Sequence, residues 1–441
     1  MNGSLYTWSN LNQYFASYLR HNGNPDVVPE DTSFLMPCIF LVQYCFMTIG
    51  VNLGNKVGPR YSTLIGILFM YLSYAIMIFF SNYYLVLVAM GIFGLGDGLA
   101  NLSVIKNCWK YFPSHEALIN GIIIGGLGIS SAILTPIADY FIINPDHVEP
   151  DKNNIYPKEI ADNLLNFLYF IAIFFLILGT FAVVFTFKYE EEESSVKIQE
   201  KEFIGRGVST LSLLWEGFRT FKNFILSLFC FCGPCNSFLF IFFIVACFLI
   251  TNTYRILGNR KNVGQSPLYL IGILFGIVNG STRFIWGFLM DKFNFKILMV
   301  IISIIEITIC FTIYFFADNP VIFVIENLLV ATCLSGTFTT ITPLFNKVFK
   351  EVGAEMYGLT GFFIGLASFL GPVLTKILIK EDDDYLIVYS VGGGICIIKF
   401  IFLFFFDENS EYIFKYKRFV PEDLGGITSN RETTLDEPTN H

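Results

Sequence analysis

An arginine inside a long apolar run is the residue of this sequence best placed for chemistry. The run extends from Ser266 to Met290, long enough to cross a bilayer, and contains Arg283. At 1.5 Å per residue, Arg283 is roughly 12 Å from Asp291, which we place at the membrane face, and so lies near the middle of the hydrocarbon core. Arginine stays protonated, and its planar fork matches a carboxylate. We therefore expect Arg283 to bind an anion in a wet cavity; a structural ion pair or a side chain reaching the interface is the alternative.

Other ionisable residues also lie within apolar runs. Asp97, among the glycines of the run Tyr84–Ile105, is interpreted as a counter-ion of Arg283, a proton site or a locally packed group. Glu326 is near a predicted helix start, where a carboxylate suits the helix dipole. We find no metal-ligand spacing, phosphate-binding glycine loop or nucleophile elbow, so we expect no metal, no cofactor and no enzymatic activity.

The composition indicates a polytopic helical membrane protein. The chain has 441 residues, of which 54% are hydrophobic and 15% charged, against about 25% charged in ordinary soluble domains. The acids of Glu190–Glu193 and Asp382–Asp384 belong to predicted loops. No basic stripe with interleaved aromatic residues is present, so nucleic acid is not an expected partner. Cys232-Gly-Pro-Cys235 copies a redox tetrapeptide, but its apolar context favours small buried cysteines beside a helix kink.

Apolar runs predict two groups of six membrane crossings. We place an N-terminal bundle at 1–189, a cytoplasmic linker at 190–221, a C-terminal bundle at 222–408 and a cytoplasmic tail at 409–441. The complete crossings are expected at Phe34–Gly54, Tyr61–Phe80, Tyr84–Ile105, Leu118–Ile143, Asn163–Phe187, Lys222–Ile250, Pro267–Leu289, Lys296–Ala317, Pro320–Val348, Met356–Lys380 and Tyr385–Phe406.

The opening stretch Gly3–Leu19 combines helical apolar spacing with many polar side chains. It is shorter than a full crossing, so we interpret it as the latter part of a cavity-lining first crossing that is truncated at its N-terminus. Tyr6, Asn10 and Gln13 are its candidate path-lining residues.

Basic residues in the short loops predict the orientation. One side of the membrane holds more of them: Lys56, Arg60, Lys106, Lys110, Lys292, Lys296, Lys347 and Lys350. The other side holds Arg20, Lys152, Lys158, Arg255, Arg260, Lys261 and Lys380. We place the residues of both groups in loops or at helix ends. Both termini are therefore expected in the cytoplasm. The sequence does not indicate which cellular membrane holds the protein.

The layout resembles the major facilitator superfamily. Both halves carry a turn similar to the family's gating turn, Gly-x-x-x-Asp-(Arg/Lys)-x-Gly. The second half has Gly287, Asp291 and Lys292 at its positions. The first half keeps Gly58 and Arg60 but has Val51 in place of the first Gly and Asn55 in place of the Asp. Within that superfamily the chain resembles the monocarboxylate and oxalate/formate carrier branch. The segments that carry this resemblance are Tyr6-Thr-Trp8-Ser9, Trp109-Lys-Tyr-Phe112-Pro113 with Gly121 to Gly128, Asn279-Gly-x-x-Arg283-x-x-Trp286-Gly287, and Tyr357-Gly358.

The resemblance implies that Arg283 holds the substrate carboxylate, with Asn279 one turn before it in the site. Oxalate/formate carriers place a lysine where this chain has Ile364, and one cation suits a monoanion better than a dianion. Monocarboxylate carriers place an acid where this chain has Asn279, so their proton-linked scheme is not carried over. The ninth crossing is usually peripheral in this fold, so we expect Glu306 to have a packing role.

Two functions follow as expectations. The first is a secondary active or facilitative transporter of a small carboxylate, a monocarboxylate in preference, working by alternating access in a lipid bilayer with a co-transported proton or an exchanged anion as possible second partner. The second is a transporter-like membrane sensor or interaction scaffold, suggested by the incomplete first crossing and by the departures in the first gating turn.

Overall fold

The described part of the chain is all helical. The computed structural model describes residues 7, 11–146, 148–151, 154–189, 239–349, 353–378 and 385–405, and no strand occurs among them. Ten of the helices in these ranges are long and apolar enough to cross a membrane. The predicted fold class, an all-α polytopic membrane protein of major-facilitator type, is confirmed.

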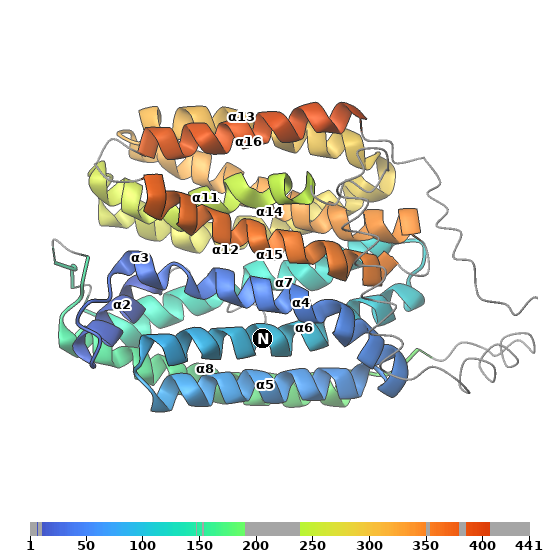
Figure 1. The fold of residues 1–441 in the computed structure, drawn as a ribbon, viewed down its shortest axis with the longest axis horizontal. Helices are drawn as coiled ribbons and strands as arrows, with labels where there is room; N and C mark the ends of the chain where they lie inside the picture. The colour runs from blue at the N-terminus through green and yellow to red at the C-terminus, as the bar shows by residue number, and fades with distance from the viewer. Residues whose placement is uncertain are drawn as a thin grey trace, which may run out of the picture.

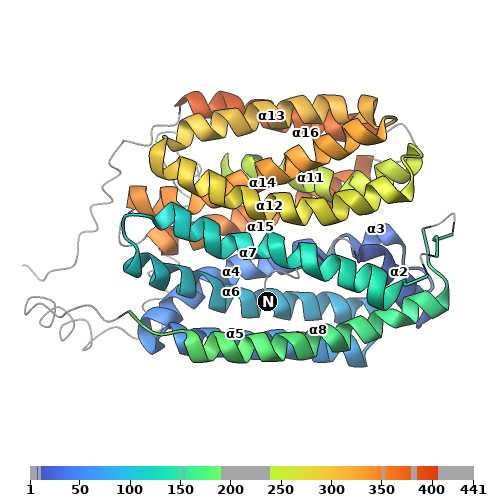
Figure 2. The same cartoon turned by 180° about the vertical axis from the view of Figure 1, so that it is seen from behind.

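The helices form two bundles that lie one above the other in Figure 1 and, from behind, in Figure 2. The first bundle consists of α2 (Asn12–His21), the short α3 (Pro29–Thr32), α4 (Leu35–Val57), α5 (Pro59–Phe79), α6 (Tyr83–Tyr111), α7 (Glu116–Pro136) with its π-helical continuation η1 (Ile137–Ile143), and α8 (Lys158–Phe185). The second consists of α11 (Leu239–Arg260), α12 (Gln265–Lys292), α13 (Phe295–Phe316), α14 (Pro320–Phe349), α15 (Gly353–Leu378) and α16 (Tyr385–Phe405).

Most helix bounds agree with the apolar runs, but two helices end later than predicted. α6 continues past Ile105 to Tyr111, so Lys106 and Lys110 lie within a helix and not in a connector. The crossing expected to end at Ile250 continues as α11 to Arg260, so Arg255 lies within a helix and not in a loop. Polar residues such as Asn252 made this stretch look like a loop, yet it keeps helical hydrogen bonding. The predicted linker at 190–221 and tail at 409–441 lie outside the described residues, as does Cys232-Gly-Pro-Cys235, and the four domain limits stay predictions.

Glycine and asparagine residues set the turns between the first helices. Gly58 has a φ of +97°, a conformation that side chains disfavour, and Pro59 opens α5 directly after it. Asn82 caps α6, because its side-chain oxygen accepts hydrogen bonds from the backbone nitrogens of Tyr84 at 3.0 Å and Leu85 at 3.3 Å. The basic residues Lys56, Arg60 and Lys292 lie at the same end of the bundles, which we call the basic end; the end with His21 is the far end.

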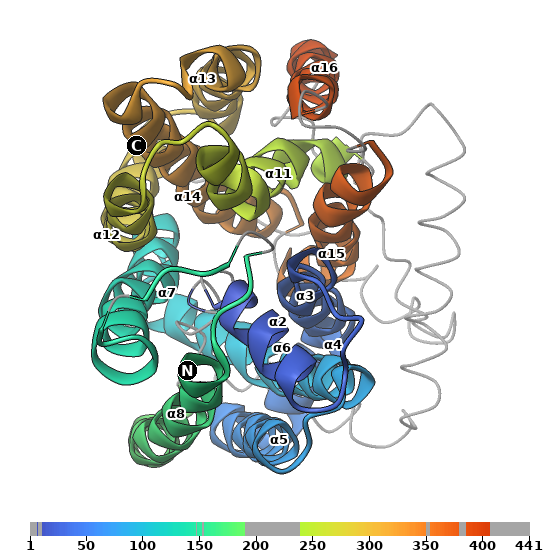
Figure 3. The ribbon, with the colours of Figure 1, turned by 90° about the vertical axis from the view of Figure 1, so that its left-hand side faces the viewer.

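Two helix pairs join the bundles, α7 with α12 and α4 with α15, as the view along the helices shows (Figure 3). Glycines permit the first pair to approach closely. A methyl group placed on Gly128 would lie 2.6 Å from the carbonyl oxygen of Gly276, and one placed on Gly121 would lie 2.6 Å from that of Arg283. Small residues of this kind are the usual means by which membrane helices pack backbone to backbone.

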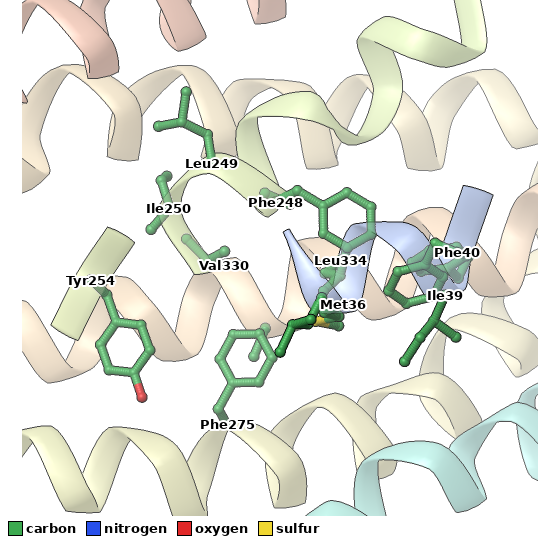
Figure 4. Packing of buried hydrophobic residues seen from close by; sticks show 14 of the residues in the cluster. Met36, Ile39, Phe40, Phe248, Leu249, Ile250, Tyr254, Phe275, Val330 and Leu334 are labelled. Atoms are coloured by element: carbon green, nitrogen blue, oxygen red, sulfur yellow. The ribbon is translucent and has the colours of Figure 1, made fainter. Parts of the chain in front are cut away.

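An apolar seal made of Phe40, Phe248 and Phe338 also crosses the junction. The ring of Phe40 on α4 lies 5.3 Å from that of Phe248 on α11, which in turn lies 6.3 Å from Phe338 on α14. Figure 4 shows Phe40 and Phe248 among the buried side chains that fill the space between the bundles. The seal therefore links one helix of the first bundle to two of the second.

Candidate substrate cavity

A cavity lies between the bundles and includes Arg283. Its volume is about 40 Å³, so the cavity is narrow in this conformation. Its walls come from α4, α6 and α7 of the first bundle and from α12, α14 and α15 of the second, with the lining residues Phe40, Gln43, Tyr44, Met47, Asn101, Leu102, Ile105, Ile124, Arg283, Phe338, Thr342 and Tyr357. Arg283 is the one charged residue in that described lining.

Arg283 is held by the residue one helical turn earlier. Its side chain is fully buried, and its Nε donates a hydrogen bond to Oδ1 of Asn279 at 3.1 Å. Asn279 is itself fixed, because its Nδ2 donates to the carbonyl oxygen of Ala331 on α14 at 3.1 Å. The guanidinium also lies 5.6 Å from the centre of the Phe338 ring. The structure thus pairs Arg283, which lines the cavity, with Asn279, which does not belong to the described lining.

Aromatic hydroxyls form part of the same wall. The rings of Tyr44 on α4 and Tyr357 on α15 are 6.4 Å apart and meet edge to face across the bundle junction. The Tyr357 hydroxyl is within hydrogen-bonding reach of Thr342 and Tyr44, and Arg283 acts electrostatically on it. Tyr357 was noted in the sequence only as part of a family pattern; here it is a cavity residue.

Two other predicted site residues, Gln13 and Asp97, lie away from the described lining. Gln13 is buried in α2 and Asp97 is buried in α6, and neither belongs to the described lining of the cavity. Tyr6 and Asn10 lie outside the described residues. Gln43, Asn101 and Phe338 line the cavity without having been singled out in the sequence. For Gln43 a signal existed, because it is an amide within an apolar run.

The predicted gating turn of the second half lies against the first bundle at the basic end. A methyl group on Gly287 would lie 2.8 Å from the carbonyl oxygen of Ala117, and Asp291 accepts hydrogen bonds from the backbone of Ala117 and Leu118. Nearby, Asn346 of α14 donates a hydrogen bond to Glu116 of α7. Lys292 lies over the Phe288 ring at 4.1 Å, whereas Arg60 is exposed in the first-half turn. The bundles are therefore in contact at this end.

The far end is closed by polar contacts between the bundles. Tyr14 of α2 donates a hydrogen bond to Asp139 of η1, and Arg255 of α11 borders the same small cavity as Asp139, with Asp139 among the charges acting on it. The Arg255 guanidinium lies 5.1 Å from the Tyr269 ring. Lys376 of α15 and Asp31 of α3 form an ion pair at 3.0 Å. The two bundles are therefore in contact at both ends of the molecule.

A second buried charge pair lies within the second bundle. Glu306 of α13 pairs with Lys399 of α16, and the thiol of Cys247 donates to Glu306 at 3.0 Å. Lys399 has 1% of its surface exposed, so each charge depends on the other for compensation. The packing role expected for Glu306 thus takes the form of an ion pair, and its partner Lys399 was missed. Glu326 instead accepts a hydrogen bond from Thr312 at 2.6 Å.

Comparison with known proteins defines the class to which this fold belongs. The sequence profile of the Major Facilitator Superfamily matches residues 3–372 and 238–419. The chain therefore belongs to the major facilitator superfamily, whose members transport small molecules across membranes.

Individual relatives are distant. The chain is 22% identical over 375 residues to the uncharacterised MFS-type transporter YhjX of Escherichia coli, covering 83% of this chain and 82% of that protein. It is 22% identical over 461 aligned positions to apicoplast pyruvate carrier 1 of Toxoplasma gondii, covering 84% and 79%. Among solved structures, the proton:xylose symporter XylE matches with a TM-score of 0.59 at 14% identity, covering 92% of this chain and 93% of that one, which establishes a common fold.

Proposed function

We propose that the protein is a secondary transporter of a small carboxylate, a monocarboxylate in preference, with Arg283 as the group that binds the carboxylate. The observation that carries the proposal is the position of Arg283: it is fully buried and borders a cavity shared by both bundles. An arginine at this depth in a membrane protein usually marks a substrate or ion pathway, and its planar fork matches the geometry of a carboxylate.

The rest of the cavity is consistent with a single carboxylate on a small organic body. Its described lining holds one cation, so a dianion would bring one negative charge without a matching partner. Ile364, at the position where the resemblance predicts lysine in oxalate/formate carriers, is fully buried and apolar. The relative from Toxoplasma gondii is named a pyruvate carrier, which agrees with this substrate class.

Alternating access would operate by exchanging the contacts at the two ends. The basic end is closed by Gly287 and Glu116, and the far end by Asp31 and Arg255 with their partners. We propose that the basic end and both termini face the cytoplasm, and that a proton or a second anion is coupled to the movement.

The test is uptake of labelled monocarboxylates into liposomes containing the purified full chain. Arg283→Ala is expected to lower uptake by about a hundredfold or more, because a charge-assisted bidentate contact is lost from a buried site. Arg260→Ala is the matched control, since Arg260 lies at the far end of α11, over the Tyr385 ring and outside the cavity lining. Normal uptake by a folded Arg283→Ala variant would refute the proposed role.

A further inference from the structure

Gln43 presents an unsatisfied acceptor to the substrate cavity. Its side chain has 4% of its surface exposed and lines the cavity from α4. Its Oε1 is buried and accepts no hydrogen bond from the described residues. A buried amide oxygen without a donor is costly, so such groups are usually satisfied by water, by protein or by a ligand.

The position of Gln43 is fixed by close helix packing. α4 crosses α6 at Gly94 and Gly98, and a methyl group on either glycine would collide with the backbone of α4, at Ile39 and at Gln43 respectively. The backbone of Gln43 therefore cannot retreat from the cavity without separating the two helices. Its amide is a fixed recognition group and not a mobile surface side chain.

Gln43 and Arg283 belong to opposite walls of the cavity. Gln43 comes from α4 of the first bundle and Arg283 from α12 of the second. A ligand that reached both would join the two bundles in the occluded state. Such a ligand would favour the conformation in which the two bundles lie close together, because it contacts both bundles only in that conformation. A ligand shifts an equilibrium only by its differential contacts with the two states.

We propose that Gln43 determines specificity by accepting a hydrogen bond from a hydroxyl group of the substrate, which makes small hydroxymonocarboxylates the preferred class. This inference rests on the proposed function, because it assumes that Arg283 holds the carboxylate. The ionised carboxylate offers only acceptors, so the donor must come from elsewhere in the ligand. An ammonium group is the other common donor, but no acid occurs in the described lining to compensate it.

The experiment compares three substrates of equal carbon number in liposomes containing the full chain: 2-hydroxypropanoate, 2-oxopropanoate and propanoate. The unaltered protein is expected to take up 2-hydroxypropanoate at least tenfold more efficiently, by kcat/KM, than either of the others. A site built to bond a hydroxyl rejects an analogue that lacks it, because the buried partner is then left unsatisfied. Equal uptake of all three, or preference for 2-oxopropanoate, would overturn the inference.

Gln43→Met tests the residue itself, because methionine has similar length and no strong acceptor. We expect the preference for the hydroxy acid to shrink to about twofold, both because the hydroxy acid loses its acceptor and because propanoate no longer leaves a buried acceptor unsatisfied. Ile49→Leu, on the same helix but exposed and outside the described lining, should keep the full preference. If Gln43→Met does not fold, Gln43→Leu serves in its place, and the preference of the unaltered protein remains an independent test.

Arg283→Ala separates this inference from the proposed function. Loss of all three uptakes in that variant, with an unchanged preference in a folded Gln43→Met variant, would reject only the role of Gln43. Uptake of no carboxylate by the unaltered protein, or persistence of uptake in Arg283→Ala, would reject the proposed function and this inference with it.

Discussion

Arg283 owes its position to Asn279, which lies one turn earlier on α12 and is itself bonded to α14. The neutral amide orients the guanidinium through Nε without cancelling its charge. An acid at the same position would orient the guanidinium equally well but would also compete with a substrate carboxylate. A neutral amide therefore does not compete with a substrate carboxylate for the guanidinium.

Replacement of Asn279 should expose this difference. Asn279→Asp is expected to raise KM for the carboxylate about tenfold or more, because the new carboxylate pairs with Arg283 in place of the ligand; a tenfold change corresponds to about 1.4 kcal/mol. Initial uptake rates over a range of substrate concentrations give KM. Asn279→Ser, which stays neutral, should change KM much less. Equal effects of the two variants would show that size and not charge matters at this position.

At this scale the sequence identifies charged residues better than neutral ones. Arg283 stands out because a charge within an apolar run has few explanations. Gln43 carries no charge, and nothing in an isolated apolar run tells which face of the helix meets a cavity. Its exposure to the cavity depends on α6 and α12, which lie far from it in the chain.

The contact between α7 and α12 brings the backbones of the two bundles close together, and glycines on both helices make it possible. Side chains at these positions would separate the helices and open the cavity wall. Gly126, by contrast, lies on α7 between these contacts but has open space where a methyl group would stand. The two kinds of glycine on one helix form a natural pair for comparison.

Gly128→Ala should lower stability by roughly 1–3 kcal/mol, because its methyl group would overlap Gly276 and Gly280 of α12. The melting temperature of the purified protein in detergent measures the effect. Gly126→Ala is the control and should leave the melting temperature unchanged or slightly raised, since alanine favours helix. A Gly128→Ala protein as stable as the original would show that α7 and α12 do not pack this closely.

The apolar runs predict where helices occur, but where a helix ends also depends on the other helices that pack against it. α11 continues to Arg260 because its polar residues face other helices and a small cavity rather than lipid or water. An apolar-run criterion ends such a helix too early. The same criterion missed Lys399, because a lysine near the end of an apolar run is ordinarily read as an interfacial side chain.

For the whole molecule, the two ends of the junction differ in chemistry. At the basic end carboxylates meet neutral donors, Asp291 with the backbone of Ala117 and Glu116 with Asn346. At the far end the bundles bring opposite charges together, Arg255 with Asp139 and Lys376 with Asp31. Two groups of six crossings could be read from the sequence. The pairing of α7 with α12 and α4 with α15, and hence these contacts, could not, because no local pattern encodes which helices meet across the junction.

Arg255→Gln should favour opening at the far end, because Asp139 loses the cation supplied by the second bundle. A cysteine introduced by Met47→Cys in the cavity would then react several times faster with a membrane-impermeant thiol reagent applied from that side. A protein that carries Arg255→Gln alone, without Met47→Cys, gives the background reaction of the native cysteines, among them the exposed Cys45. Arg260→Gln is the control, since its guanidinium lies over Tyr385 within its own bundle. An unchanged or slower reaction would contradict this role of Arg255.

The rings of Phe40, Phe248 and Phe338 have a consequence for the energetics of the transport cycle. Separating them exposes apolar surface to water, a process with a large heat-capacity change, so the temperature dependence of uptake should curve on a logarithmic plot. Added salt screens an exposed ion pair such as Asp31 with Lys376 but has little effect on contacts between apolar rings. If separation of these rings limits the rate of transport, turnover should depend strongly on temperature and only weakly on ionic strength.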